Sequence, residues 1–268
     1  MVGEQARKEV NLWIEKHTKG RIRNLLPTGC FSDSDAAIVL ASALYFKAKW
    51  CVPFDTSKTE IEDFHLLDGQ TIKVPTMKMK GKSFHFASFK GFQVLRMSYR
   101  SADYKYFSMY FLLPHKRDGL KQMLERLNSD PSLLVGNLGT REAPFTKIWI
   151  PKLKFSYQLE ARNVMEDLGL VLPFKPSGEF TKMVVSAPDS EKLCISDIIH
   201  KSCIEVNEEG SKAAACSLAT TVVGCARIPK PPPPRTFVAD HPFMFLIKGF
   251  KSDETVFAGV VINPLLKD

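Results

Sequence analysis

One segment of the chain differs in composition from everything around it: Glu205-Val-Asn-Glu-Glu-Gly-Ser-Lys-Ala-Ala-Ala-Cys-Ser-Leu-Ala-Thr-Thr-Val-Val-Gly-Cys-Ala-Arg-Ile-Pro-Lys-Pro-Pro-Pro-Pro-Arg235. It begins acidic, continues with small uncharged residues, turns β-branched and ends in prolines. From Ser211 to Val223 every second residue is small or β-branched, and in an extended chain these side chains share one face. The charge of Lys212 falls on the opposite face. The segment could therefore enter the middle of a β-sheet, or remain a surface loop with a stiff polyproline II tail.

On both sides of this segment the chain mixes helical and strand patterns. Helical periodicity predicts helices near 4–19, at 118–128 and at 158–168. The run 36–46 is apolar on both faces, which predicts a strand buried in the centre of a sheet. Asp68-Gly69 predicts a hairpin turn between strands at 64–67 and 71–77. Further strands are predicted at 84–86, 93–99, 106–113, 146–150, 153–157, 243–248 and 255–262. Without a βαβ rhythm, a repeat or a clear linker before 207, we expect one α+β domain.

Composition excludes several classes of protein. The chain has 268 residues, of which 44% are hydrophobic and 25% charged, and this range is globular rather than disordered or fibrous. The longest apolar stretch, 36–46, is far shorter than the roughly 20 residues of a membrane span. The net charge of +8 is spread along the chain, with no zinc-finger or RNA-recognition motif. We therefore expect neither nucleic-acid binding nor membrane insertion.

Catalytic and metal-binding motifs fail in this sequence. Gly81-Lys82-Ser83 resembles the end of a phosphate-binding loop, but Thr76 stands where that motif needs a glycine. The six cysteines form no C-x-x-C pair, and neither G-x-S-x-G nor H-E-x-x-H occurs. The sequence therefore predicts no catalytic residue, no metal site and no cofactor. The beginning, MVGEQARKEV, has no apolar signal core, so we expect a cytoplasmic location.

Four stretches together resemble the serpin family, and the sequences of the hinge and the signature are most similar to those of plant serpins. Glu205–Ala215 resembles the hinge of the serpin reactive-centre loop, and Phe237-Val-Ala-Asp-His-Pro-Phe-Met-Phe-Leu-Ile resembles the signature that follows it. Leu44-Tyr-Phe-Lys-Ala-Lys-Trp-Cys-Val-Pro-Phe resembles the third strand of the large sheet and its exit. Trp13-Ile-Glu with Asn24-Leu-Leu resembles the helix that lies across that sheet. The implied fold is the α+β serpin fold, with mixed β-sheets, packed helices and an exposed reactive-centre loop over 208–235.

The resemblance implies an inhibitor of serine endopeptidases, with cysteine endopeptidases as a further class of target, rather than an enzyme. A target protease would attack the loop and form an acyl-enzyme. The freed hinge would then insert as a new strand of the large sheet and carry the protease with it. Small side chains suit this step because they pass between neighbouring strands without overpacking. The hinge residues are Glu208, Glu209, Gly210, Ser211, Lys212, Ala213, Ala214, Ala215 and Cys216.

The position of the cleaved bond has two candidates. In the family the hinge glycine lies fifteen residues before the cleaved bond, so Gly210 places Gly224 on the acyl side and Cys225 on the leaving side. Gly224 offers no side chain to a protease pocket. Arg227-Ile228 is a more attractive trypsin-like site, but it lies three residues later.

Three further residues are carried over by position to the region where the sheet opens. His200 matches the buried histidine of the family beneath the opening sheet. The asparagine expected as its partner is replaced by Ser42, which can also hydrogen-bond, with shorter reach. Trp50 matches the tryptophan near the top of the sheet, where the hinge enters.

Compared with a complete serpin, the chain corresponds to a form without the N-terminal third, which supplies the first helices and part of the large sheet. Loss of that burial is large against the ~5–15 kcal/mol by which domains are stable, and it exposes a sheet edge. We therefore expect a marginally stable product. Together with the atypical Gly224, this favours an alternative function as a non-inhibitory serpin-like protein. The resemblance also makes the extracellular space an alternative location.

Overall fold

The computed structural model describes residues 2–31, 37–100, 107–175, 180, 193–209, 235–249 and 253–266. These residues belong to two compact units. Unit 1 contains the described parts of 1–46 and 155–204, and unit 2 contains those of 47–154 and 205–266. No helix in the described ranges is both long and apolar enough to cross a lipid bilayer.

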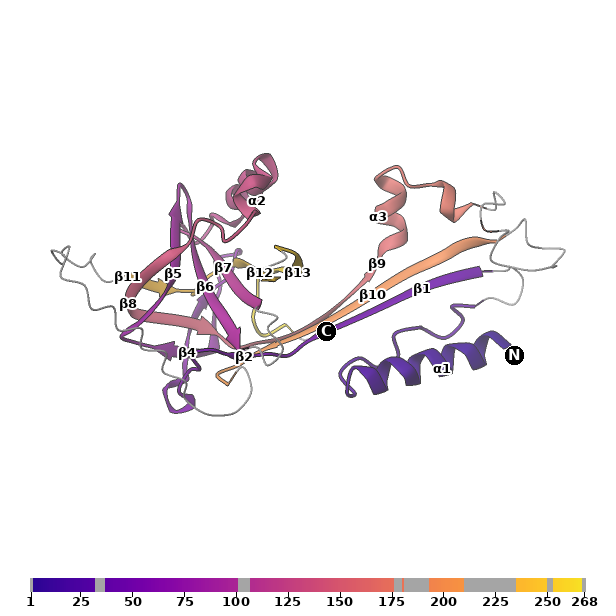
Figure 1. Ribbon diagram of the computed structural model, residues 1–268, viewed down its shortest axis with the longest axis horizontal. Helices are drawn as coiled ribbons and strands as arrows, with labels where there is room; N and C mark the ends of the chain where they lie inside the picture. Colours follow the sequence, from indigo (N-terminus) through magenta and orange to yellow (C-terminus); the bar gives the residue numbers. More distant parts are fainter. Residues whose placement is uncertain are drawn as a thin grey trace, which may run out of the picture. The chain divides into compact units, whose positions relative to one another are not determined.

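Unit 1 is a sheet covered by a helix. Its described elements are α1 (Val2–His17), β1 (Ala37–Phe46), β9 (Leu153–Glu160), α3 (Ala161–Asp167), the 3-10 turn η3 (Leu172–Phe174) and β10 (Cys194–Val206). The strand order is β1–β10–β9, and β1 runs parallel to β10 (Figure 1). Ile14 of α1 packs with Ile22, Leu25 and Leu26 against Ile199 of β10. The helix predicted near 4–19 is thus confirmed, and its apolar face forms the core of unit 1.

Two buried polar side chains fix the path of the chain after α1. The Thr18 hydroxyl donates to the Ile14 carbonyl at 2.8 Å and accepts from the Ile22 amide at 3.1 Å. The Asn11 amide donates to the carbonyl of Leu26 at 3.0 Å and accepts from its N–H at 2.9 Å. These bonds satisfy backbone groups that the end of a helix leaves unpaired. They hold the returning segment against α1.

The central position predicted for the strand at 36–46 is wrong within the described residues. There β1 has a partner strand on one side, β10, and Leu40 and Leu44 are 45% and 36% exposed. Val39 and Ala43 pack against the apolar cluster beneath α1. Both faces are apolar in sequence, as predicted, but one of them is covered here.

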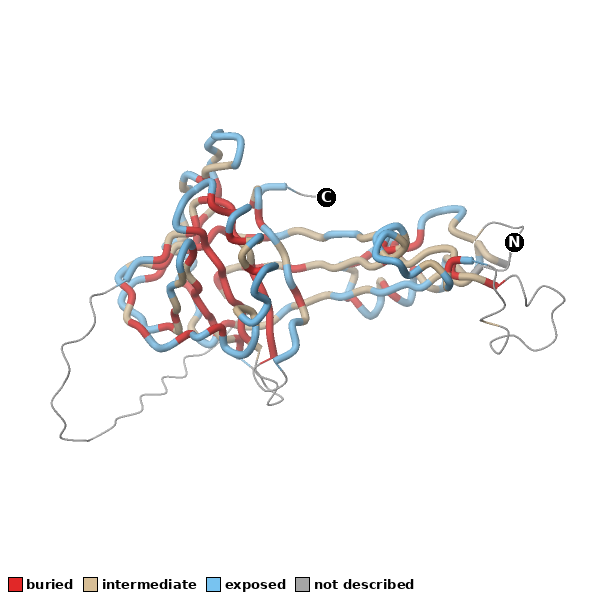
Figure 2. Tube along the Cα trace, turned by 90° about the horizontal axis from the view of Figure 1, so that it is seen from above, coloured by how far each residue is buried: buried red, intermediate tan, exposed pale blue. Residues whose placement is uncertain are grey.

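Unit 2 is built mainly of strands. Its described elements are β2 (Lys49–Trp50), η1 (Thr56–Lys58), β3 (Glu60–His65), β4 (Thr71–Met79), β5 (Lys82–Phe89), β6 (Phe92–Arg100), β7 (Phe107–Pro114), α2 (Leu120–Ser129), η2 (Pro131–Leu134), β8 (Arg141–Pro151), β11 (Arg235–Val238), β12 (Phe243–Gly249) and β13 (Thr255–Val261). The strand order is β13–β12–β7–β6–β5–β8–β4–β3, with β11 on β8 and β2 on β6. Figure 2 shows the buried positions gathered on these strands. The fully buried phenylalanines of this core are Phe64, Phe92, Phe111, Phe237, Phe243 and Phe245.

Most predicted elements of unit 2 are confirmed. The hairpin of β3 and β4 turns at Gly69, whose φ of +85° is readily adopted by glycine. Helix α2 lies where 118–128 was predicted and buries Leu120, Met123 and Leu127. In unit 1, by contrast, the helix predicted at 158–168 begins only at Ala161. Residues 158–160 continue β9 instead, because pairing within the sheet outweighs local helical preference.

Lys248 is a buried cation that joins two connections of unit 2. Its side chain is 3% exposed, and its ammonium donates to the carbonyls of Leu134 at 2.5 Å and Gly136 at 3.2 Å. It also forms an ion pair with Asp253 at 2.7 Å. Asp253 accepts a hydrogen bond from the Gly136 amide at 2.9 Å. The network ties the turn after η2 to the connection between β12 and β13.

Replacing Lys248 by methionine keeps the apolar stem and removes the ammonium, so the carbonyls of Leu134 and Gly136 lose a donor and the Asp253 carboxylate loses its ion pair. We expect K248M to lower the free energy of unfolding by about 1–3 kcal/mol in urea titrations followed by circular dichroism. The control is K121M on α2, where the side chain is 87% exposed and little change is expected. Equal stabilities of K248M and K121M would contradict this account.

Candidate functional site

The end of β10 is held by hydrogen bonds from β2 and from the segment that follows it. The indole N–H of Trp50 donates to the carbonyl of Asn207 at 2.9 Å, and the Phe54 amide donates to the carbonyl of Glu208 at 3.0 Å. Trp50 is 3% exposed and stacks on the buried ring of Tyr99, with ring centroids 4.2 Å apart. The predicted hinge therefore leaves β10 from a rigid aromatic support.

The side chain of Glu208 is the centre of this site. It is buried, with 6% of the residue exposed. One carboxylate oxygen accepts a hydrogen bond from the Thr59 hydroxyl at 2.6 Å, and the other contacts the Lys152 ammonium at 3.0 Å. Thr59 precedes β3, and Lys152 lies between β8 and β9, with its own amide donating to Pro75 at 2.8 Å. We call Trp50, Thr59, Lys152 and Glu208 the hinge anchor.

The partners of Glu208 decide its charge. Burial by itself raises the pKa of this carboxyl group, because it disfavours the ionised form. The hydrogen bond from Thr59 and the positive charge of Lys152 outweigh that effect and hold the pKa of Glu208 below its ordinary value of 4.5. The carboxylate is therefore ionised at neutral pH, and the anchor is complete there.

Within unit 1 the structure brings Ser42 and His200 together. They lie opposite each other in the parallel register of β1 and β10, and the His200 Nδ1 lies 3.0 Å from the Ser42 hydroxyl oxygen. His200 is half-buried, and the pair is accessible to solvent. Serine thus reaches the histidine despite its short side chain. Any separation of β1 from β10 must break this bond together with the backbone ladder.

The stretch that resembles the family signature has a structural role at the start of β12. Phe237 is fully buried on β11. The ring of His241 bridges the Asp240 carboxylate at 2.7 Å and the Pro114 carbonyl at 2.9 Å. The Asp240 carbonyl accepts from the His65 amide at 2.7 Å. These contacts join the ends of β3 and β7 to the corner before β12.

The remaining predicted site residues lie outside the described residues. These are the hinge residues Gly210, Ser211, Lys212, Ala213, Ala214, Ala215 and Cys216, and the candidate reactive positions Gly224, Cys225, Arg227 and Ile228. Of the predicted hinge, Glu208 and Glu209 are described. Sequence reasoning missed Thr59 and Lys152, because no local pattern relates them to a glutamate so far along the chain.

Comparison with known proteins gives a consistent result. The family model described as Serpin (serine protease inhibitor) matches residues 2–264. Serpin-Z3 of Arabidopsis thaliana is 42% identical over 261 residues, which cover 96% of this chain and 65% of that relative. Serpin-ZXA of Oryza sativa subsp. japonica is also 42% identical, and the match covers 96% of this chain and 63% of that protein. The chain thus spans less than two thirds of the length of these curated relatives.

Solved structures share the fold. The native stressed conformation of AtSerpin1 from Arabidopsis superposes with a TM-score of 0.81 at 38% identity, covering 98% of this chain and 66% of that one. Uncleaved ovalbumin superposes with a TM-score of 0.75 at 27% identity, covering 98% of this chain and 63% of that one. The mixed sheets and few helices described above are therefore those of the serpin fold, as the sequence predicted.

Glu208 gives the stability of the protein a defined pH dependence. Because its folded-state pKa is lowered, the carboxylate stabilises the fold above its ordinary pKa, and this contribution is lost as the pH falls through the folded value. We expect E208Q to be less stable than the unchanged protein by about 1–2 kcal/mol at pH 7. The difference should shrink as the pH falls through the lowered folded-state pKa of Glu208, because both side chains are neutral once the carboxyl group is protonated.

Urea titrations at several pH values measure this difference. The control is E125Q, which removes an exposed carboxylate whose ion pair with Lys121 spans 4.0 Å, and no such difference is expected for it. A stability difference for E208Q that is unchanged between neutral and acid pH would show that the charge of Glu208 plays no part.

Proposed function

The chain belongs to the serpin family, and from that premise we propose that it inhibits endopeptidases as a suicide substrate. In this proposal residues 1–268 act as one serpin domain, and 208–235 is its reactive-centre loop. The observation that carries the proposal is the hinge anchor, which pins Glu208 where β10 ends. Directly beyond it the sequence has the small residues that strand insertion requires.

The first step is an acyl transfer to the protease. The protease hydroxyl, or the thiol in a cysteine protease, attacks the carbonyl carbon of Gly224. The bond to the Cys225 nitrogen breaks, and the proton of the nucleophile passes to the leaving amine. An ester or thioester then links the protease to the arm that begins at Gly210. Arg227-Ile228 is the alternative bond, and it fits a trypsin-like protease because arginine supplies a charged anchor for its pocket.

The second step is insertion of that arm between β1 and β10. These strands are parallel, so an arm that turns back after Glu209 runs antiparallel to both and can pair with each. Ser211, Ala213 and Ala215 alternate on the face that would be buried. The bond between Ser42 and His200 must open for the arm to enter. New backbone hydrogen bonds on two sides replace the β1–β10 ladder.

A non-inhibitory serpin-like protein is the second candidate function. The observation that favours it is Gly224 on the acyl side of the predicted bond, since this residue has no side chain that could bind in the specificity pocket of a protease. In that case a protease would cut the loop and leave. The two functions differ in whether the acyl-enzyme persists.

Incubation with trypsin and with papain separates the two functions. We expect a complex that survives denaturing electrophoresis, because insertion traps the acyl-enzyme before water hydrolyses it. Mass spectrometry of the released C-terminal peptide then identifies the bond, Gly224–Cys225 or Arg227–Ile228. A cut loop without any adduct, for every protease tested, would refute inhibition and favour the second function.

A pair of substitutions tests the insertion step itself. In A213R a charge falls on the face that would be buried, and burial of an unpaired charge opposes insertion. The yield of the protease complex should therefore fall by more than about tenfold. In A214R the same charge falls on the opposite face, and the complex should persist. Loop-cleaved protein should melt at a higher temperature than intact protein for A214R but not for A213R. Equal behaviour of the two variants would overturn the insertion mechanism.

A further inference from the structure

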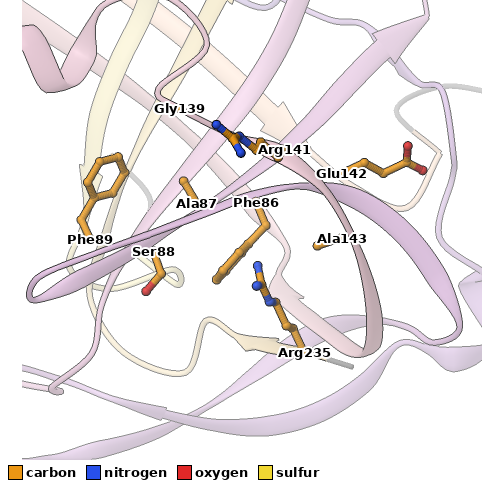
Figure 3. Close-up of a pocket in the computed structure, with 9 residues that line it drawn as sticks. All are labelled: Phe86, Ala87, Ser88, Phe89, Gly139, Arg141, Glu142, Ala143 and Arg235. Carbon is orange, nitrogen blue, oxygen red and sulfur yellow. The ribbon is translucent and has the colours of Figure 1, made fainter. Parts of the chain in front are cut away.

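A cavity of about 490 Å³ lies in unit 2, and none of the residues that line it belongs to the hinge anchor (Figure 3). It is lined by β5, by the start of β8 and by the first residue of β11. Its volume is within the range of small-molecule sites, roughly 300–1,000 Å³. The residues that matter for the argument are Phe86, Arg141, Glu142 and Arg235.

The cavity exists because two paired strands part. β5 pairs with β8 as far as Phe86 opposite Arg141, but it pairs with β6 as far as Phe89 opposite Phe92. Beyond Phe86 the chain that leads into β8 turns away at Gly139, whose φ is +62°. The apolar side chains that line the space between the chains are those of Phe86, Ala87, Phe89 and Ala143.

The cavity is pre-formed around Arg235. The guanidinium carbon of Arg235 lies 4.6 Å from the centroid of the Phe86 ring, which in turn packs edge-on against Phe145 at 5.7 Å. The Arg235 carbonyl accepts a hydrogen bond from the Thr146 hydroxyl at 3.3 Å. Backbone and guanidinium are thus both held in place, and a ligand that binds here loses less free energy to ordering of this side chain.

Among the residues that the structure describes, both arginines of the cavity lack an acidic partner. Within the described part of the chain, neither Arg141 nor Arg235 has a carboxylate at ion-pair distance, although Glu142 also lines the cavity. Figure 3 shows the two guanidinium groups apart from each other, with Phe86 between them and the Glu142 carboxylate turned aside. The cavity therefore offers two separate positive groups across an apolar surface.

We propose that this cavity binds a small organic dianion, with two acid groups joined by a flat apolar body. One acid group contacts Arg141 and the other contacts Arg235, and guanidinium groups suit carboxylates because they donate in a planar fork. The body of the ligand lies against Phe86, whose ring lies between the two guanidinium groups. This activity is additional to protease inhibition and uses none of the hinge anchor.

Calorimetric titration of the full chain at low salt tests the proposal with four probes. Naphthalene-2,6-dicarboxylate should bind, and 2-naphthoate, with one acid group, should bind about three- to fivefold more weakly. The dimethyl ester of the diacid and inorganic phosphate should bind negligibly, because the first has no charge and the second cannot span both arginines. Added salt should weaken binding of the diacid. Absence of diacid binding, or equal binding of the monoacid, would overturn the proposal.

Variants locate the site. R141Q and R235Q should each lower the affinity for the diacid about three- to fivefold, to the affinity that the unchanged protein has for the monoacid. K116Q removes an exposed positive charge elsewhere in unit 2 and should change nothing. E142Q should tighten binding about twofold, since it removes the negative charge at the rim. A damaged fold cannot mimic that gain, so unchanged affinity in E142Q together with unchanged affinity in both arginine variants would refute this site.

Discussion

The ionised, buried carboxylate of Glu208 is the constraint on which the proposed mechanism depends. A charge out of water is tolerated when each oxygen has a partner, and Thr59 and Lys152 supply one each. Thr59 directly precedes β3 and Lys152 directly follows β8, so the start of the predicted hinge is tied to the strands of unit 2. In the proposed mechanism the loop is cut and then moves, so it needs a fixed end, and this anchor would provide one.

The parallel pair of β1 and β10 supplies the other requirement. Because the two strands are parallel, a third strand that runs antiparallel to both could pair with each of them once they separate. The pair is closed here by its backbone ladder and by the contact of Ser42 with His200. In the proposed insertion step, the hydrogen bonds between β1 and β10 would be replaced by a larger number of hydrogen bonds, which the inserted arm would form with both strands. This relation connects membership of the serpin family to the proposed use of the loop.

The sequence and the structure agree where the signal is local. The hairpin at Asp68-Gly69 and helix α2 follow from turn chemistry and periodicity, and both are found as predicted. The start of α3 was missed because sheet pairing extends β9 through residues with helical spacing. The central placement of β1 was wrong within the described residues, since an apolar pattern reports what a strand can bury and not what covers it. Thr59 and Lys152 could not be predicted, because their contact with Glu208 joins segments far apart in the chain.

The sequence by itself determined the family, the run of small residues in the proposed hinge and the identity of the histidine and serine that meet across β1 and β10. It could do so because these features depend on residue type and short spacing, which can be recognised in the sequence without knowledge of the structure. The tertiary structure alone decided the partners of Glu208, the exposed face of β1 and the cavity between Arg141 and Arg235. Each of these depends on distances between elements, and such distances are fixed by packing and by long-range pairing of strands.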